Sequence, residues 1–449
     1  MKGYNYWSYA PYKPLLRNVG DIYICRVVPY EYKIHFEWLG EEETEYSVYY
    51  RKREDEDFIY YSQISGRECD IEGLDTETDY EFYVMAGDKK SLVRLARTGK
   101  SIGTVVNYLH PDDEVYSFSG RYLCSPSFVR HPDGFLLASM DVYQGGTPQN
   151  LSLIFRSDDD GETWHYVSEL MPCFWGKLFI HKGELYMLSV NTEYGDLLIG
   201  KSLDGGRTFS APVTLLRGSN GKSGEPGIHK NPQNVFRFNG RIYESLEWGN
   251  HSGKCRHTAM VMSCDENDDL LVPENWSFTE PQPYSVGVGE NIEGTIVMDR
   301  KGRLLDILRV CDEGGKAIVY EIDKEDHEAP VKHVGFMSFP AHCSKFTIKY
   351  DDISDKYYSV ATRVYAGNGC WRRNLLSLMV SNDLESWEVA TDLYDFRGVD
   401  DEHIGLQYVD FEFEGDDIIY LCRTAFNNAN SFHDTNYSTF HRIKNFRSI

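Results

Sequence analysis

The sequence RSDDDGETWHYV at residues 156–167 decides the fold, because its pattern returns as KSLDGGRTFSAPV at residues 201–213. Both copies fit S-x-D-x-G-x-T-(W/F), and the motif positions are Ser157, Asp159, Gly161, Thr163 and Trp164 in the first copy and Ser202, Asp204, Gly206, Thr208 and Phe209 in the second. These residue types suit a tight turn, since aspartate accepts backbone N–H bonds across a loop and glycine adopts a positive φ. We expect each aromatic ring to fold back as a plug.

A weaker third copy, VSNDLESWEV at residues 380–389, keeps Ser381, Asp383 and Trp387 but lacks the glycine. Each copy follows an apolar strand, and hairpin tips that recur in this way indicate a radial array of similar blades. Six similar units follow residue 101 and begin near Leu123, Pro172, His229, Asn291, His342 and Gln407. The sequence therefore predicts an all-β protein with a six-bladed β-propeller, closed by residues 103–118. Seven blades are the alternative.

Residues 20–99 have a different pattern, with short alternating strands expected at 32–38, 45–52, 57–64, 68–74 and 80–88. The stretch GLDTETDYEFYV at 73–84 resembles the signature of fibronectin type III modules, in which the tyrosine, here Tyr80, pins a corner of a β-sandwich. We predict three parts, namely an N-terminal segment at 1–19, a fibronectin type III-like β-sandwich at 20–99 and the propeller at 101–449.

The composition narrows the function classes. A formal net charge of −24 argues against binding to nucleic acid or to an anionic membrane. The ten cysteines are scattered without a C-x-x-C pair, and no ligand spacing indicates a metal, so we expect neither a metal nor another cofactor. Because the N-terminal residues MKGYNYWSYAPYKP form no apolar leader, we expect a cytoplasmic protein unless a signal peptide has been removed.

A second group of motifs carries a resemblance to a known family. In GENIEGTIVMDRKGRLLDILRV, at residues 289–310, Glu293 is followed by a strand, a DRKG turn, a second strand and Arg309. In GLQYVDFEFEGDDIIYLCRT, at residues 405–424, Tyr408 precedes a similar hairpin. These segments resemble the sialidase superfamily, in which the turns at 157–164 and 202–209 are called aspartate boxes, also known as BNR repeats.

The resemblance implies that Tyr408 is the nucleophile, that Glu293 is its base and that arginines hold the substrate carboxylate. Arg309 would be one of these arginines, and either Arg372 or Arg373 would be another. The chemistry is coherent, since a carboxylated anomeric carbon repels a carboxylate nucleophile but not a neutral phenol. The competing interpretation is a buried ion pair between Glu293 and Arg309, with Tyr408 as a core aromatic residue.

Two parts of the family pattern are missing. Cys124 stands where the family has its first arginine, and Arg121 can replace that arginine only if the strand bulges. Asp141 has no second acid after it, so we expect Asp141 or Glu247 to be the general acid. The remaining residues expected to contact substrate are His229, Trp248 and His342.

The resulting hypothesis is an exo-acting glycoside hydrolase that removes a terminal, acidic sugar from a glycan, with carbohydrate as its partner. One alternative is a polysaccharide lyase, in which a tyrosine or histidine abstracts the proton next to a uronate carboxylate. The other is a glycan-binding propeller without catalysis, which the missing arginine and acid favour.

Overall fold

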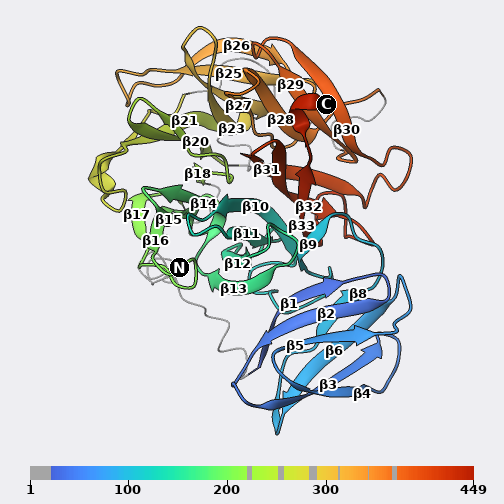
Figure 1. The fold of residues 1–449 in the computed structure, drawn as a ribbon. Helices are drawn as coiled ribbons and strands as arrows, with labels where there is room; N and C mark the ends of the chain where they lie inside the picture. Colours follow the sequence, from blue (N-terminus) through green and yellow to red (C-terminus); the bar gives the residue numbers. More distant parts are fainter. Residues whose placement is uncertain are drawn as a thin grey trace.

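The computed structural model describes residues 22–219, 225–250, 257–282, 291–311, 314–341, 343–366 and 372–449. It shows a ring of antiparallel sheets with a smaller pair of sheets beside it (Figure 1). Two short 3-10 helices, η3 (Pro273–Asn275) and η4 (Phe446–Ser448), occur among these residues. In the same ranges, no helix has the length and apolar character needed to cross a membrane. The expected N-terminal segment at 1–19 lies outside the described residues.

Six sheets surround a common axis, and in the first five the chain runs from the innermost strand outward (Figure 1). The first three sheets contain β10 (Tyr122–Arg130), β11 (Leu136–Tyr143), β12 (Leu151–Ser157) and β13 (His165–Leu170); β14 (Phe174–His181), β15 (Glu184–Val190), β16 (Leu197–Ser202) and β17 (Val213–Leu216); and β18 (Gly227–His229), β19 (Phe236–Phe238), β20 (Arg241–Gly249), β21 (Thr258–Asp265) and β22 (Trp276–Phe278).

The other three sheets contain β23 (Asn291–Met298), β24 (Leu304–Val310), β25 (Lys316–Ile322) and β26 (Lys332–Ser338); β27 (Lys349–Asp351), β28 (Lys356–Thr362), β29 (Leu375–Ser381) and β30 (Trp387–Asp395); and β31 (Gly405–Glu414), β32 (Asp417–Ala425), β33 (Tyr437–Ile443) and β9 (Thr104–Tyr108). The prediction of an all-β, six-bladed propeller preceded by a small β-sandwich is confirmed.

The last blade takes its outermost strand from the start of the propeller. Strand β9 pairs with β33, which places Tyr108 opposite Tyr437. This closure was expected from residues 103–118, and it joins the first and last blades into a ring.

Two blades differ from the regular pattern that the sequence suggests. The inner strand of the third blade is interrupted between β18 and β19, where Pro232 cannot donate a ladder hydrogen bond. In the fifth blade the inner strand begins only at Lys349. The expected start of that unit, His342, lies outside the described residues.

The two matching turns have the hydrogen bonds that their spacing predicts. Asp159 Oδ1 accepts the Thr163 N–H at 2.8 Å, and Ser157 Oγ accepts the Gly161 N–H at 2.8 Å. Gly161 has a φ of 92°, and the Trp164 ring is fully buried beneath the turn. In the second turn the corresponding bonds join Thr208 to Asp204 at 2.9 Å and Gly206 to Ser202 at 2.9 Å. Side chains thus fix the backbone of both loops.

The weaker third copy forms a similar turn without glycine. Leu384 takes the left-handed conformation there with a φ of 67°, and its N–H donates to Ser381 Oγ at 2.9 Å. Asp383 Oδ1 accepts the Ser386 N–H at 2.8 Å. The serine and aspartate therefore hold this turn together even though its leucine is strained.

Alanine at two glycines with nearly the same positive φ should separate steric packing from backbone strain. A Cβ at Gly161 (φ 92°) would lie 2.1 Å from Phe440 Cε1, whereas a Cβ at Gly134 (φ 95°) would have nothing within 4 Å. We expect Gly134→Ala to lower the free energy of unfolding by about 1 kcal/mol, and Gly161→Ala by a further ~1–3 kcal/mol. Urea unfolding of both variants measures the difference. Equal losses would contradict the packing of the turn on β33.

Two sheets make up the small sandwich. One contains β1 (Tyr23–Pro29), β2 (Lys33–Leu39) and β5 (Glu68–Glu72); the other contains β4 (Ile59–Ser65), β3 (Glu45–Lys52), β6 (Asp79–Ala86), β7 (Lys89–Lys90) and β8 (Arg94–Arg97). As expected of a corner tyrosine, Tyr80 Oη accepts the Asp75 N–H at 2.9 Å. The exact domain boundaries and the likeness to fibronectin type III modules stay predictions.

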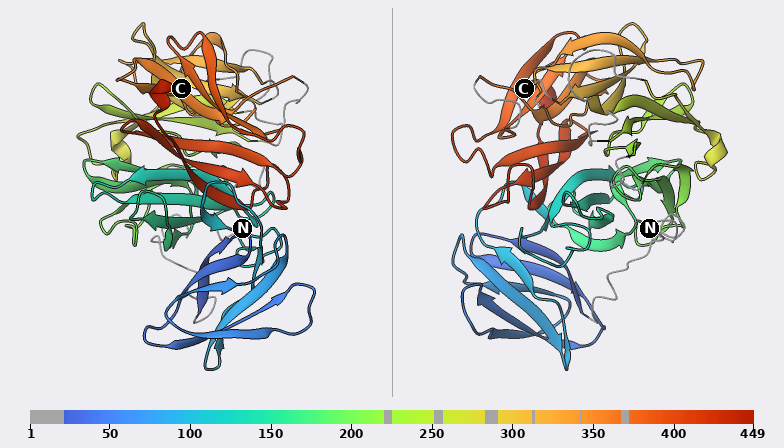
Figure 2. Two further views of the ribbon diagram at one scale, coloured as in Figure 1. Left: turned by 45° about the vertical axis from the view of Figure 1, so that its right-hand side comes forward. Right: turned by 180° about the vertical axis from the view of Figure 1, so that it is seen from behind.

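The sandwich is bonded to the start of the propeller. Arg94, at the beginning of β8, forms a buried ion pair of 2.7 Å with Asp113. Arg26 Nε, on β1, donates to the carbonyl oxygen of Val106 in β9 at 2.8 Å. Because these contacts involve the closing strand and the loop that follows it, the sandwich lies beside the first and last blades (Figure 2).

Candidate active site

Four inner strands carry a similar β-bulge near their N-terminal ends. The pairing register shifts at each bulge, and one residue in each takes a positive φ: Ser125 (50°), Trp175 (50°), Glu293 (64°) and Tyr408 (57°). A bulge of this kind re-aims a side chain that a regular strand would direct elsewhere. Two of these residues are the glutamate and the tyrosine that the sequence singled out.

Glu293 and Tyr408 meet at this end of the axis although they come from different blades. Tyr408 Oη donates to Glu293 Oε1 at 2.6 Å. Arg309, on β24, places its Nε 2.5 Å from Glu293 Oε2, and its Nη2 donates to Tyr408 Oη at 3.4 Å. All three side chains are buried. The glutamate, the tyrosine and the first arginine thus form one cluster.

Arg373 also belongs to this cluster. Its Nη1 donates to the side-chain oxygen of Gln407, and its guanidinium lies 5.6 Å from the centre of the Tyr408 ring. The carbonyl oxygen of Cys343 accepts a bond from Arg373 Nη2 at 3.3 Å and one from Arg309 Nη1 at 2.6 Å. One backbone carbonyl therefore holds two guanidinium groups side by side.

Arg372 and Arg121 lie apart from this cluster. The Arg372 guanidinium is partly exposed and pairs with Asp401 at 2.7 Å. Between the neighbours Arg372 and Arg373, the structure therefore brings only Arg373 to the tyrosine. Arg121 pairs with Glu114 at 2.5 Å, also at the surface.

A third arginine, Arg423 on β32, reaches the cluster and was not anticipated from the sequence. Its guanidinium lies 5.0 Å from the centre of the Tyr408 ring, and its Nη2 donates to the His433 carbonyl oxygen at 2.5 Å. Burial and Asp141 raise the pKa of the Cys124 thiol to about 12, while the nearby charge of Arg423 opposes the rise. In the first blade, Cys124 stands where an arginine was expected. Arg423, from the last blade, approaches that position.

The protonation states suit a phenol beside an ionised carboxylate. Burial, with Glu293 close by, raises the pKa of Tyr408 to about 12, so its hydroxyl is neutral near pH 7. Burial alone would raise the pKa of Glu293, but Arg309 and its other positively charged neighbours outweigh burial and lower it below its usual value. Burial lowers the pKa of Arg373 to about 10, which still leaves it charged at neutral pH.

Asp141 and Glu247 occupy matching places on the second strands of the first and third blades, and each binds the bulge of the following blade. Asp141 Oδ2 accepts the Trp175 N–H at 2.7 Å. Glu247 Oε1 accepts the Glu293 N–H at 2.6 Å and the Gly294 N–H at 3.2 Å. These carboxyl groups therefore hold bulge backbone in place, and Glu247 does so at Glu293 itself.

The pH dependence of stability should reveal the buried Asp141 carboxyl. Burial raises the pKa of Asp141 from 3.8 to about 7, so between these values the folded protein retains a proton that the unfolded chain has lost. This carboxyl must therefore make the unfolding free energy fall as pH rises through that window. Asp141→Asn has no such proton. Between pH 4 and 8 we therefore expect its free energy of unfolding to rise by up to about 4 kcal/mol relative to that of the unaltered protein. Urea unfolding at several pH values tests this, and a pH-independent difference would contradict it.

The other residues expected to contact substrate divide into three cases. His229 Nδ1 lies 2.5 Å from Glu247 Oε2, which joins it to the cluster through that carboxyl. Trp248 lies next to Glu247 on β20 and packs, partly buried, against the apolar core between the second and third blades. His342 lies outside the described residues.

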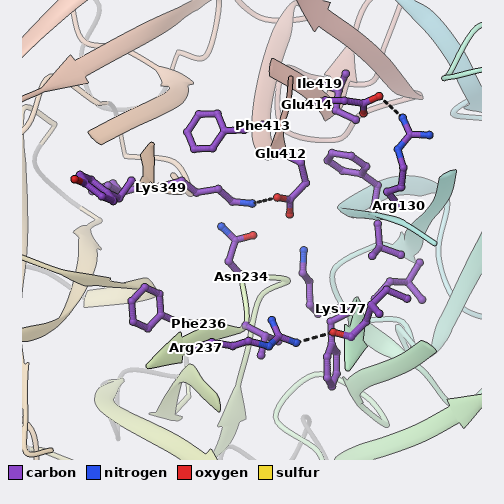
Figure 3. A pocket seen from close by; sticks show the side chains of 18 of the residues that line it. Arg130, Lys177, Asn234, Phe236, Arg237, Lys349, Glu412, Phe413, Glu414 and Ile419 are labelled. Carbon is purple, nitrogen blue, oxygen red and sulfur yellow. Dashed lines mark hydrogen bonds and ion pairs between the residues drawn. The ribbon is translucent and has the colours of Figure 1, made fainter. Parts of the chain in front are cut away.

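A separate cavity of about 870 Å³ opens at the other end of the axis, where the inner strands end (Figure 3). Its lining includes Lys349, which pairs with Glu412 at 2.6 Å, and Lys177, which pairs with the buried Asp410 at 2.7 Å. The members of the tyrosine cluster do not line it. Within the described ranges, no three histidine, cysteine, aspartate or glutamate side chains are grouped to hold a metal ion.

Comparison with known proteins identifies the fold. No family model matches the chain, and no curated protein sequence matches it. Among solved structures, a Hadza microbial sialidase superposes with a TM-score of 0.53 at 13% identity, over 97% of this chain and 98% of that one. A leech intramolecular trans-sialidase gives 0.53 at 10% identity, over 99% and 95% of the two chains.

An α-L-arabinofuranosidase of Fusarium graminearum gives a TM-score of 0.51 at 11% identity, over 76% of this chain and 97% of that one. At these identities the similarity shows the fold alone. The chain has the β-propeller fold that is shared by sialidases and this arabinofuranosidase.

Proposed function

We propose that this protein is a glycoside hydrolase that removes a terminal sugar bearing a carboxylate from a glycan. The observation that carries the proposal is the 2.6 Å hydrogen bond from Tyr408 to Glu293, with Arg309, Arg373 and Arg423 around it. The fold supports the proposal because it is also found in glycosidases.

In the proposed reaction, Tyr408 Oη attacks the anomeric carbon while Glu293 accepts the phenol proton. A phenol with a pKa of about 12 is a weak nucleophile by itself, so an adjacent ionised carboxylate is what makes the attack feasible. The glycosidic C–O bond breaks as the new bond forms, and a general acid gives its proton to the leaving oxygen. Water then attacks the anomeric carbon and returns a proton to that acid, the bond to Tyr408 breaks, and the phenolate recovers its proton from Glu293.

The three arginines support an anionic substrate. Guanidinium groups stay charged at neutral pH and match the planar geometry of a carboxylate, so a ring of them selects an anionic sugar. Their charge also supplies a local attraction for an anion on a chain whose net charge is −24. A neutral furanoside would bring no negative charge to these guanidinium groups.

The test is to incubate the protein with acidic oligosaccharides and aryl glycosides, including sialosides and glucuronides, and to identify the products by mass. A released, saturated acidic monosaccharide is expected. A product lighter by one water that absorbs in the ultraviolet would instead establish a lyase. Saturable binding without turnover would overturn the enzymatic proposal in favour of a glycan-binding propeller.

A further inference from the structure

The cavity at the end of the axis opposite the tyrosine cluster has the size of a ligand site. Its volume of about 870 Å³ lies in the range of protein pockets that hold small molecules. Phenylalanine rings, among them those of Phe236 and Phe413, line it together with charged and polar side chains (Figure 3). The residues of the tyrosine cluster do not line it, so the proposed reaction gives this cavity no role.

Three of the four cations that line this cavity are paired with carboxylates: Lys349 with Glu412 at 2.6 Å, Lys177 with Asp410 at 2.7 Å, and Arg130 with both Glu414 and Asp160. The fourth is Arg237 on β19, which forms no ion pair with any carboxylate in the described ranges; its Nη2 donates to the Ile180 carbonyl oxygen at 2.6 Å. Glu266 and Glu412 lie close enough to interact with its charge, but partial burial outweighs them and lowers its pKa. Arg237 therefore brings to the cavity a positive charge that no direct contact with an acid neutralises.

A second side chain at the cavity lacks a hydrogen-bond partner. The Asn234 side chain points into the cavity (Figure 3), and its amide nitrogen and amide oxygen are both buried without a hydrogen bond to any described residue. Buried polar groups are rarely left in this state, because each one costs stability. Asn234 lies in the interruption between β18 and β19, close in the chain to Arg237. The two side chains therefore come from one wall of the cavity.

We infer that this cavity is a binding site for a small hydroxylated carboxylic acid, such as a sugar acid. The carboxylate pairs with Arg237, whose bond to Ile180 leaves donors on Nε and Nη1. Asn234 offers both a donor and an acceptor, which suits a hydroxyl group, since a hydroxyl also donates and accepts. Acetate would pair with the arginine but would bring no donor to the amide oxygen. The inference does not depend on the proposed function.

Crystals soaked with D-glucuronate, together with calorimetry in solution, test the inference. We expect density for the probe in the cavity, with its carboxylate on Arg237, and saturable binding in solution. D-glucose has the same ring without the charge, so it should bind about tenfold more weakly or worse. Because the tyrosine cluster is also proposed to bind an acidic sugar, the crystal identifies the site and variants of the cavity assign the calorimetric signal to it.

The first variants change the charge of the cavity. Arg237→Gln keeps a donor for Ile180 and removes the charge, so we expect glucuronate to bind this site about tenfold more weakly or worse. Arg237→Lys keeps the charge and should weaken binding less. Arg207→Gln is the matched control, because Arg207 is also exposed and bonded to a backbone carbonyl, that of Asp204 at 3.3 Å, but does not line the cavity. It should leave binding unchanged.

The next variant separates binding from folding. Asn234→Leu removes a buried amide that has no partner, so the ligand-free protein should unfold at a higher temperature while glucuronate binds more weakly. Unchanged binding in Asn234→Leu, equal affinity for glucuronate and glucose, or equal losses in Arg237→Gln and Arg207→Gln would overturn the inference. Density in the crystal without saturable binding in solution would also overturn it. Binding in the cavity without turnover of any acidic glycoside would support the inference and overturn the proposed function alone.

Discussion

Replacing Tyr408 with phenylalanine should lower kcat/KM by about 10³-fold or more, because it removes only the oxygen that attacks the anomeric carbon. The substitution also removes the donor of the 2.6 Å bond to Glu293, but Arg309 still pairs with that carboxylate at 2.5 Å. The cluster should therefore remain assembled. Initial rates on an aryl glycoside of the acidic sugar, with thermal unfolding of the same sample, separate lost chemistry from lost folding.

Tyr357→Phe is the matched control. Tyr357 is also a buried tyrosine, and its hydroxyl donates to the Met298 carbonyl oxygen at 2.9 Å, away from the cluster. We expect this variant to lose about 1 kcal/mol of stability and to keep its kcat/KM. If Tyr408→Phe were as active as the control, the phenol would not be the nucleophile.

Replacing Arg423 with glutamine should produce the second large effect, and one that depends on substrate charge. Removing one side of a buried charge contact costs several kcal/mol, so we expect kcat/KM for the acidic sugar to fall by about 10²-fold or more. The methyl ester of the same sugar presents no charge, so it should lose less than about tenfold. Measuring kcat/KM for the acid and for the ester with both proteins gives the ratio of the two losses.

Arg372→Gln provides the control for this experiment, since Arg372 is paired with the partly exposed Asp401 and lies apart from Tyr408. It should leave both substrates unaffected. Equal losses on acid and ester in Arg423→Gln would show that Arg423 supports the fold without binding the carboxylate.

The sequence predicts best those parts of the site that lie within a single hairpin. Glu293 and Arg309 flank one hairpin of the fourth blade and pair across it in nearly the same register, so a sequence spacing reports a spatial contact. Tyr408 was identified in the same way from the sixth blade. The turns at Asp159 and Asp204 are equally local, since their hydrogen bonds lie within a few residues.

Arg423 was missed because the family pattern seeks the missing arginine in the first blade. A signal was nevertheless present: Arg423 follows Tyr408 at almost the same interval as Arg309 follows Glu293, and it pairs with Gln407 as Arg309 pairs with Ile292. Comparing the second strands of all blades would have found it. In the same comparison, Asp141 and Glu247 occupy the positions on their second strands that Arg309 and Arg423 occupy on theirs.

The contacts that Asp141 and Glu247 make with neighbouring blades could not be predicted from the sequence. Asp141 and Glu247 each bind the backbone of the following blade, and no spacing along the chain encodes which N–H groups they meet. Their raised pKa values follow from the same burial. Likewise, the choice between Arg372 and Arg373 depends on the direction in which adjacent side chains point before β29, which alternation alone does not determine.

The most direct measurement is to trap the glycosyl–enzyme intermediate. A fluorine beside the anomeric carbon of an acidic glycosyl fluoride slows both steps by destabilising their positively charged transition states, while fluoride leaves without protonation. After incubation and proteolysis, mass spectrometry should find the sugar on the peptide that contains Tyr408 and no label in Tyr408→Phe. A label on another residue, or turnover of the natural substrate without any labelling by the fluoride, would contradict the account.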